Sequence, residues 1–338
     1  GMDLQIADYA PFLVTAFQSK EGAEALGSML GLQAGGIKGL GVDMGSFDLE
    51  MESLDGKINL NYGGGTNAGS QNVVRFAASL AALMLPERYN RLFEEADEDG
   101  QFADRLLVMR AIIDWADQDT VIFGTSAAED YRYNARENDP YEIKNHYFDT
   151  VEELRLVKGV DDEFMAAFGD AFTVYGDCKV NVNLADHSVI AALIMQHATT
   201  PTDQSLRWEN VALVARYVVH IREFYGGYSD FKTFVKVIEQ PAKAVVPTYN
   251  PGDGQFRDED TPVMQKHFPI AQGIKVNQKT LKEAVVVGGP RRIWKIKATS
   301  EVGRIKKAIT AIWDAKFVST QSRRHNMGPG GFMYWREE

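Results

Sequence analysis

Two distant parts of the sequence carry the pattern of β-strands, and helical patterns fill the chain between them. Near the start, strand candidates span Phe47–Leu54 and Lys57–Asn61. Near the end, polar and apolar residues alternate through Ile293–Ala298, and Phe332–Trp335 forms a further short strand candidate. Isolated strand pairs are only marginally stable in water. We therefore expect the first and last parts of the chain to complete one sheet, with the helical part inserted between them.

Turn residues refine this expectation. Asp55-Gly56 separates the first two strand candidates, and this dipeptide favours a tight hairpin because both of its residues tolerate positive φ. We therefore expect those two strands to pair with each other. Toward the other end, Lys306–Trp313 alternates like a strand, but the isoleucines of this region also fit helical spacing, so both structures stay open.

The first residues carry an amphipathic helical pattern. Apolar side chains keep to one stripe over Asp8–Leu30, Pro11 fits only near the first turn, and the glycine-rich Gln33–Gly41 ends the helix. The expected fold class is α+β: an N-terminal helix packed on an antiparallel sheet, interrupted by a large, mostly α-helical insertion. The expected boundaries are 1–66 for the helix and first strands, 67–285 for the insertion, and 286–338 for the returning strands.

The insertion is expected to be helical because apolar residues recur there at helical spacing. The segments concerned are Val73–Met84, Glu87–Ala96, Phe102–Trp115, Val151–Lys158, Glu163–Phe168, Ser188–His197, Leu206–Phe224 and Phe231–Glu239. Tyr62–Thr66 is rich in glycine but lacks the Gly-Lys-Ser/Thr ending of a phosphate loop, so we interpret it as a linker.

One stretch, Phe148–Leu193, carries several local signals in a fixed order. Two short helices flank Gly159, a strand-like Phe172–Tyr175 follows, Lys179–Asn183 alternates, and a third helix begins after a cap at Asp186. This order is more specific than any one of its parts.

The sequence words of this stretch resemble a known family. They are VEELRLVKG (Val151–Gly159), TVYGD (Thr173–Asp177), KVNVN (Lys179–Asn183) and a helix ending in IAAL (Ile190–Leu193). Together they resemble general secretion pathway protein K, the large minor pseudopilin of the bacterial type II secretion system. Two distant segments agree with it, Asp55–Asn61 (DGKINLN) and Met333–Glu337 (MYWRE), so the resemblance extends over nearly the full length.

The resemblance implies a pseudopilin-like fold and a structural role: capping the tip of a short periplasmic pseudopilus and so supporting protein export. It implies binding to two smaller minor pseudopilins, the I and J components, at the periplasmic face of the inner membrane of a Gram-negative bacterium. Contact with the membrane is expected only through an N-terminal helix that this sequence does not include. Gly1-Met2 is typical of an expression remnant, and no run of 18 apolar residues is present.

Acidic residues gather in the middle of the chain. From Glu87 to Asp177 there are 23 Asp and Glu against 9 Lys and Arg, a net charge of −14, whereas the whole chain carries −11. Within this region DWADQD and AAEDYRY match the part of the resembled family that binds calcium. The expected ligands are Asp114, Asp117, Asp119, Glu129 and Asp130, completed by backbone carbonyls of residues 120–128. The EF-hand pattern is absent, and a solvated acidic loop is the alternative.

Two other classes of function are alternatives to this one. The two helices around Gly159 permit a helix-hairpin-helix DNA-binding protein, but Asp161, Asp162 and Glu163 occupy the positions that a phosphate would face. A calcium-dependent adhesin or enzyme ranks lower. The six histidines lack ligand spacing, and the single Cys178 follows an aspartate that would raise its pKa. We therefore expect neither nucleic-acid binding nor enzymatic activity.

Overall fold

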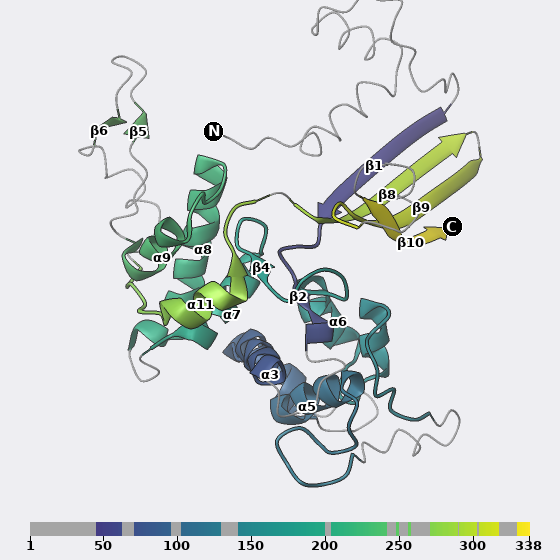
Figure 1. Cartoon of the computed structure of the whole chain (residues 1–338), viewed down its shortest axis with the longest axis horizontal. Helices are drawn as coiled ribbons and strands as arrows, with labels where there is room; N and C mark the ends of the chain where they lie inside the picture. The colour runs from purple at the N-terminus through teal and green to yellow at the C-terminus, as the bar shows by residue number, and fades with distance from the viewer. Residues whose placement is uncertain are drawn as a thin grey trace, which may run out of the picture. The chain divides into compact units, whose positions relative to one another are not determined.

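The chain divides into two compact units. The computed structural model describes residues 45–62, 71–95, 103–129, 141–199, 204–241, 248–249, 256–257, 271–289, 291–302, 304–317 and 330–338. The first unit joins Gly1–Asp55 to Gly289–Glu338, and the second is the continuous stretch Gly56–Gly288 that interrupts it (Figure 1). The interruption thus begins at Gly56 rather than after residue 66. The amphipathic segment Asp8–Leu30 lies outside the described residues.

The first unit contains a four-stranded antiparallel sheet in the order β1-β8-β9-β10. Its strands are β1 (Gly45–Ser53), β8 (Ile293–Val302), β9 (Ile305–Asp314) and β10 (Gly331–Glu337). The ambiguous segment before Asp314 is therefore a strand. The expected mixture of helices with an antiparallel sheet is confirmed, and strands from both ends of the chain form this sheet.

The register pairs opposite charges on one face of the sheet and aromatic side chains on the other. On one face Glu50 lies opposite Lys297 and Glu52 opposite Lys295. On the other face Trp294 lies opposite Trp313, and Trp313 lies opposite Phe332. Because side chains alternate along a strand, a register shift by one residue would exchange these two sets, so the pattern fixes the pairing.

The predicted hairpin at Asp55-Gly56 was wrong. Asp55 Oδ2 instead accepts hydrogen bonds from the backbone N–H groups of Arg292 (2.7 Å) and Ile293 (3.1 Å), so it ties the end of β1 to the start of β8. The next strand, β2 (Ile58–Asn59), pairs in parallel with β3 (Phe172–Thr173) inside the second unit. Gly56 serves close approach rather than positive φ: a Cβ there would lie 2.5 Å from the carbonyl carbon of Leu184.

The second unit is mainly helical, with short strand pairs: β2-β3 and β4-β7 are parallel, and β5-β6 is antiparallel. Its longer helices are α3 (Gln71–Met84), α5 (Arg105–Ala116), α7 (His187–His197), α8 (Trp208–Tyr225), α9 (Phe231–Glu239) and α11 (Gln278–Ala284). Shorter elements are η1 (Leu60–Tyr62), η2 (Glu87–Tyr89), α4 (Arg91–Glu94), η4 (Val151–Leu156), α6 (Asp162–Phe168), η5 (Gly169–Ala171), η6 (Gln204–Leu206), β4 (Val180–Asn181), which pairs with β7 (Val285–Val286), and the pair β5 (Thr248–Tyr249) and β6 (Phe256–Arg257). No described helix is both long and apolar enough to cross a bilayer.

Helix α7 forms the centre of this unit. Six consecutive residues, Val189 to Ile194, are buried, and a helix that is apolar on all sides requires neighbours on all sides. Its main helical neighbours are α3 and α8. Asp186 begins α7 as predicted, since its side chain accepts a hydrogen bond from the Ser188 N–H.

The hairpin around Gly159 packs against α5. Its first arm is the 3₁₀-helix η4 rather than an α-helix, and its second arm is α6, capped by Asp161. Gly159 has a φ of 78°, and a Cβ at this position would lie 2.6 Å from Ala103 Cβ and 2.8 Å from Val108 Cγ2. Glycine is therefore required here both for its backbone conformation and for the space it leaves.

We expect Gly159→Ala to destabilise the second unit by about 3 kcal/mol, because the left-handed backbone strain adds to the overpacking against α5. Urea unfolding followed by circular dichroism measures the change. Gly124→Ala is the matched control: φ there is 73°, but no atom lies within 4 Å of the added Cβ. It should cost about 1 kcal/mol. Equal losses in the two variants would show that contact with α5 contributes nothing.

Candidate metal centre

The C-terminal end of α5 and the loop after it bring distant carboxylates together. Asp117 ends the helix, and its backbone N–H donates to the Ile113 carbonyl (3.0 Å). The loop then folds back on itself: Ile122 N–H donates to the Ala127 carbonyl (2.9 Å), and Glu129 N–H donates to the Thr120 carbonyl (3.0 Å). This closure returns Glu129 to the helix end where Asp117 lies.

Asp117, Asp119 and Glu129 form a tight group. Each presents a carboxylate oxygen within 4.8 Å of those of the other two. Asp117 is fully buried, and among the described residues both of its carboxylate oxygens lack a hydrogen-bond partner. The same is true of both carboxylate oxygens of Glu129. Since unpaired buried charges are strongly unfavourable, this group requires either protons or a cation.

Asp114 and Asp119 each use one carboxylate oxygen for a hydrogen bond within the chain. Asp114 is fully buried, and its Oδ1 accepts a hydrogen bond from the Phe123 N–H (2.9 Å), so it is committed to the loop at that oxygen. Asp119 Oδ1 likewise accepts from the Val121 N–H (2.9 Å). Asp130 lies outside the described residues. The ligand set expected from the sequence stays a prediction, and the structure brings three of its members together.

Burial and mutual repulsion raise the pKa of two members of the group. Burial, followed by the charges of Asp119, Asp114 and Glu129, raises the pKa of Asp117 to about 8. Burial, followed by the charges of Asp114 and Asp119, raises the pKa of Glu129 to about 7. The backbone of Asp119 and the side chain of Asn145 oppose these rises, but neither reaches hydrogen-bond geometry with the buried oxygens. The group therefore holds protons near neutral pH when no cation is bound.

The donor chemistry fits a hard divalent cation. All three grouped side chains offer carboxylate oxygens, the ligands that calcium takes at flexible sites. The backbone carbonyls of Thr120, Ile122 and Ala127 already accept hydrogen bonds within the loop, although a carbonyl oxygen has a second lone pair. Asp117, Asp119 and Glu129 would hold the cation, which would supply the positive charge that this buried group lacks.

A fourth polar group at this place, Asn145, could not be predicted from the sequence. Its Oδ1 is buried and has no partner among the described residues, and its side chain lies beside Glu129. An asparagine in a polar loop carries no pattern that would mark it as a ligand. Its position depends on the folding of the following segment back onto α5, which is a tertiary feature.

The hairpin around Gly159 uses its acidic residues within the chain. Asp161 Oδ1 caps α6 by accepting from the Phe164 N–H (2.6 Å). Asp162 pairs with Arg155, and Glu163 pairs with Arg91. A phosphate at the start of α6 would have to displace these carboxylates. The expectation that nucleic acid does not bind stays a prediction, and this geometry supports it.

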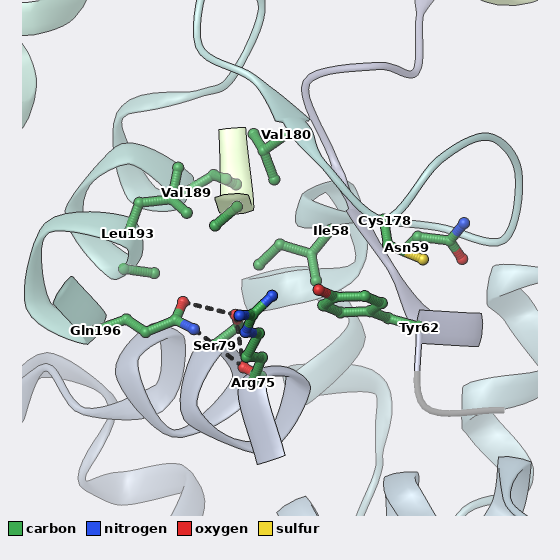
Figure 2. Close-up of a pocket in the computed structure, with 12 residues that line it drawn as sticks. Ile58, Asn59, Tyr62, Arg75, Ser79, Cys178, Val180, Val189, Leu193 and Gln196 are labelled. Atoms are coloured by element: carbon green, nitrogen blue, oxygen red, sulfur yellow. Dashed lines mark hydrogen bonds between the residues drawn. The ribbon is translucent and has the colours of Figure 1, made fainter. Parts of the chain in front are cut away.

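A pocket between α3 and α7 offers no reactive group (Figure 2). Ser79 and Gln196 hydrogen-bond to each other (2.8 Å) and both contact the Arg75 carbonyl, while the Arg75 guanidinium pairs with Glu283. Cys178 is an exposed residue, but desolvation by surrounding atoms, and then the charge of Asp177, raises the pKa of its thiol to about 11, so the thiol is a poor nucleophile.

Comparison with known proteins gives a consistent family for one part of the chain. Residues 56–177 match the family model described as Type II secretion system (T2SS), protein K. This range contains the Gly159 hairpin and the candidate metal centre, and it is narrower than the near full-length resemblance expected. No curated protein matches the chain.

Among solved structures, the chain is similar to one from the GspK-GspI-GspJ complex of the enterotoxigenic Escherichia coli type 2 secretion system. The identity is 15%, the match covers 87% of this chain and 80% of that chain, and the TM-score is 0.49. A likeness of this size adds nothing to the family model. Over residues 56–177 the chain therefore matches the family of type II secretion system protein K, and the resemblance predicted from its sequence is confirmed there.

Proposed function

We propose that this protein is a structural component of a type II secretion pseudopilus, the minor pseudopilin that caps its tip and so supports protein export. The observation that carries the proposal is the family match over residues 56–177. The matched segment belongs to the second unit, so the resemblance lies in the inserted helical body.

The arrangement of the chain supports a capping role. A pseudopilus grows by stacking similar subunits, and the unit made of Gly56–Gly288 is a large addition to a small sheet unit. An addition of that size would obstruct a further subunit above it. The proposed partners are the I and J minor pseudopilins and the pseudopilus itself, at the periplasmic face of the inner membrane, with membrane contact through an N-terminal helix.

We expect the chain to form a complex with the I and J ectodomains from the same bacterium. Mixing the three at micromolar concentration should give one earlier-eluting species containing all of them, measured by size exclusion with light scattering. A parallel titration with duplex DNA at low salt tests the alternative, because phosphate attraction is strongest there. Separate elution of the chain, or saturable DNA binding that weakens steeply with salt, would contradict the proposal.

We propose further that Asp117, Asp119 and Glu129, with Asp114 and Asp130 nearby in sequence, hold one calcium ion that stabilises the second unit. The buried, unpartnered oxygens of Asp117 support this most directly. Calcium suits the site better than magnesium, because an irregular loop accommodates the flexible coordination shell of calcium more readily than strict octahedral geometry.

We expect the metal-free protein to lose stability as pH rises. The pKa values of Asp117 (about 8) and Glu129 (about 7) are raised above those of an unfolded chain, so their favourable contribution is present at acid pH. It is fully present below the ordinary pKa values of 3.8 and 4.5, and it is lost progressively as pH rises toward 8. In chelator, the melting temperature should therefore fall between pH 5.5 and 8.5. Calcium at one hundred times its Kd should restore about 2.7 kcal/mol, with its largest effect at pH 8.5.

Two variants show whether this behaviour belongs to the site. Asp117→Asn should flatten the fall in chelator, raise the metal-free melting temperature at pH 8.5, and abolish the effect of calcium. Asp170→Asn removes the same charge from an exposed position and should behave like the parent. If calcium leaves the parent unchanged after thorough chelation, and Asp117→Asn melts no higher, the residues form only an acidic loop.

A further inference from the structure

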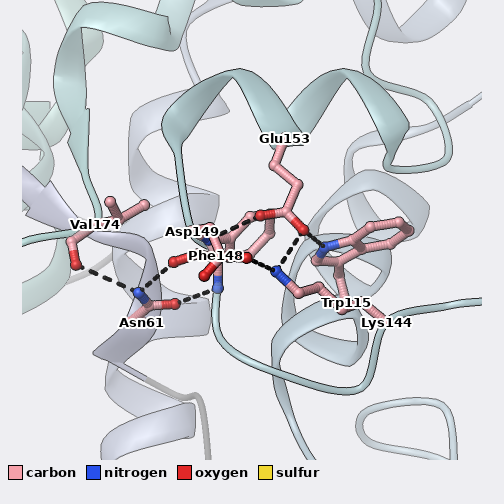
Figure 3. Close-up of polar contacts among 7 residues, drawn as sticks. All are labelled: Asn61, Trp115, Lys144, Phe148, Asp149, Glu153 and Val174. Atoms are coloured by element: carbon pink, nitrogen blue, oxygen red, sulfur yellow. Dashed lines mark hydrogen bonds and ion pairs between the residues drawn. The ribbon is translucent and has the colours of Figure 1, made fainter. Parts of the chain in front are cut away.

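Residues 141–149, which we call the strap, pass the end of α5, and Figure 3 shows Lys144 and Phe148 of the strap near Trp115 of that helix. The strap reaches the helix backbone directly, since the His146 N–H donates to the Trp115 carbonyl (3.2 Å). Trp115 lies two residues before Asp117 on the chain. The strap is therefore placed against the part of α5 that presents the buried carboxylate.

Ion pairs fix the strap at Lys144. The Lys144 Nζ lies 2.6 Å from Glu153 Oε1 and 2.8 Å from Asp149 Oδ2. Glu153 belongs to η4 and also accepts hydrogen bonds from the Trp115 Nε1–H (3.4 Å) and from the Asp149 N–H (2.8 Å). Glu153 thus connects the strap, α5 and the hairpin arm η4.

A second anchor fixes the end of the strap. The Asn61 side chain exchanges two hydrogen bonds with the backbone of Phe148: Oδ1 accepts from its N–H (2.7 Å), and Nδ2 donates to its carbonyl (2.9 Å). Asn61 Nδ2 also approaches the Val174 carbonyl (3.3 Å). The strap is therefore held on both sides of Asn145, at Lys144 and from His146 onward.

Asn145 has a φ of 48°, a left-handed conformation that asparagine tolerates better than most residues. Its Oδ1 is buried without a partner among the described residues. The Asn145 side chain lies beside Glu129, whose two carboxylate oxygens also have no partner among the described residues. A buried acceptor left without a partner is unfavourable, because it has lost its hydrogen bonds to water. An amide oxygen is a neutral ligand for calcium and adds no further charge to a crowded carboxylate group.

We propose that Asn145 Oδ1 is a ligand of the cation held by Asp117, Asp119 and Glu129, so that binding of the cation fastens the strap to the end of α5. This inference rests on the proposed calcium site. It adds that cation binding is coupled to the packing of η4 and of Asn61, because the same strap carries Asn145 and both anchors. The cation then stabilises more of the second unit than the loop that supplies the carboxylates.

The test uses the whole chain with calcium chloride alone as the probe. Calorimetric titration should show that Asn145→Gly binds calcium at least about tenfold more weakly than the parent. Loss of even an outer-shell partner of a metal ligand typically weakens metal binding by about that factor. Hydrogen exchange should show calcium slowing the amides of His146, Phe148 and Asp149 in the parent and not in the variant. Glycine tolerates the positive φ, so the melting temperature in chelator should be nearly unchanged.

Asn145→Asp separates ligation from packing. The added carboxylate keeps an oxygen for the cation but increases repulsion, so it should bind calcium at least as tightly as the parent and melt lower in chelator. The inference is overturned if Asn145→Gly binds calcium like the parent, or if calcium protects the three amides equally in both proteins. If the parent itself binds no calcium, the proposed site fails and this inference with it. If the parent binds calcium and Asn145→Gly binds it more weakly, the result supports both the proposed calcium site and the role of Asn145 as a ligand.

Discussion

The physical constraint on which the second unit depends is the burial of a carboxylate without a hydrogen-bond partner. Asp117 is fully buried at the end of α5, and Glu129 is brought back to it by backbone hydrogen bonds within the loop. Placing two unpaired carboxylates in such a position is costly for any fold. Near neutral pH the cost can be avoided by taking up protons, which the raised pKa values reflect, or by binding a cation.

The acidic group of Asp117, Asp119 and Glu129 lies within the segment that matches the family model. Residues 56–177 include α3, α5, the loop after α5, the strap and the Gly159 hairpin. Glu153 joins three of these elements through one carboxylate, and Asn61 joins the strap to the strand β3 region. An ion in the acidic group would therefore lie close to a set of contacts that joins α5, η4, the strap and Asn61.

Local signals in the sequence predicted local structure well. Asp186 caps α7 where expected, because capping depends on the residue and its next three neighbours. The alternation in Ile293–Ala298 predicted β8 for a similar reason. The hairpin predicted at Asp55-Gly56 was wrong. The Asp55 side chain accepts a hydrogen bond from the backbone at the start of β8, and Gly56 lies close to the backbone of Leu184. The parallel pairing of β2 with β3 joins residues more than 100 positions apart, and nothing local indicates it.

The candidate site, too, could be predicted only in the part that depends on local sequence. Clustered carboxylates near the end of a helix were visible in the sequence, and Asp117, Asp119 and Glu129 do lie together. Tertiary folding decides which of these carboxylates is buried without a partner, and it brings the Asn145 side chain beside Glu129. Equilibrium dialysis against micromolar calcium, with the metal counted by atomic emission, tests the cation site most directly. We expect about one ion per chain in the parent and none in a folded Asp117→Asn variant. A parent without bound calcium, or equal counts in the two proteins, would contradict the site.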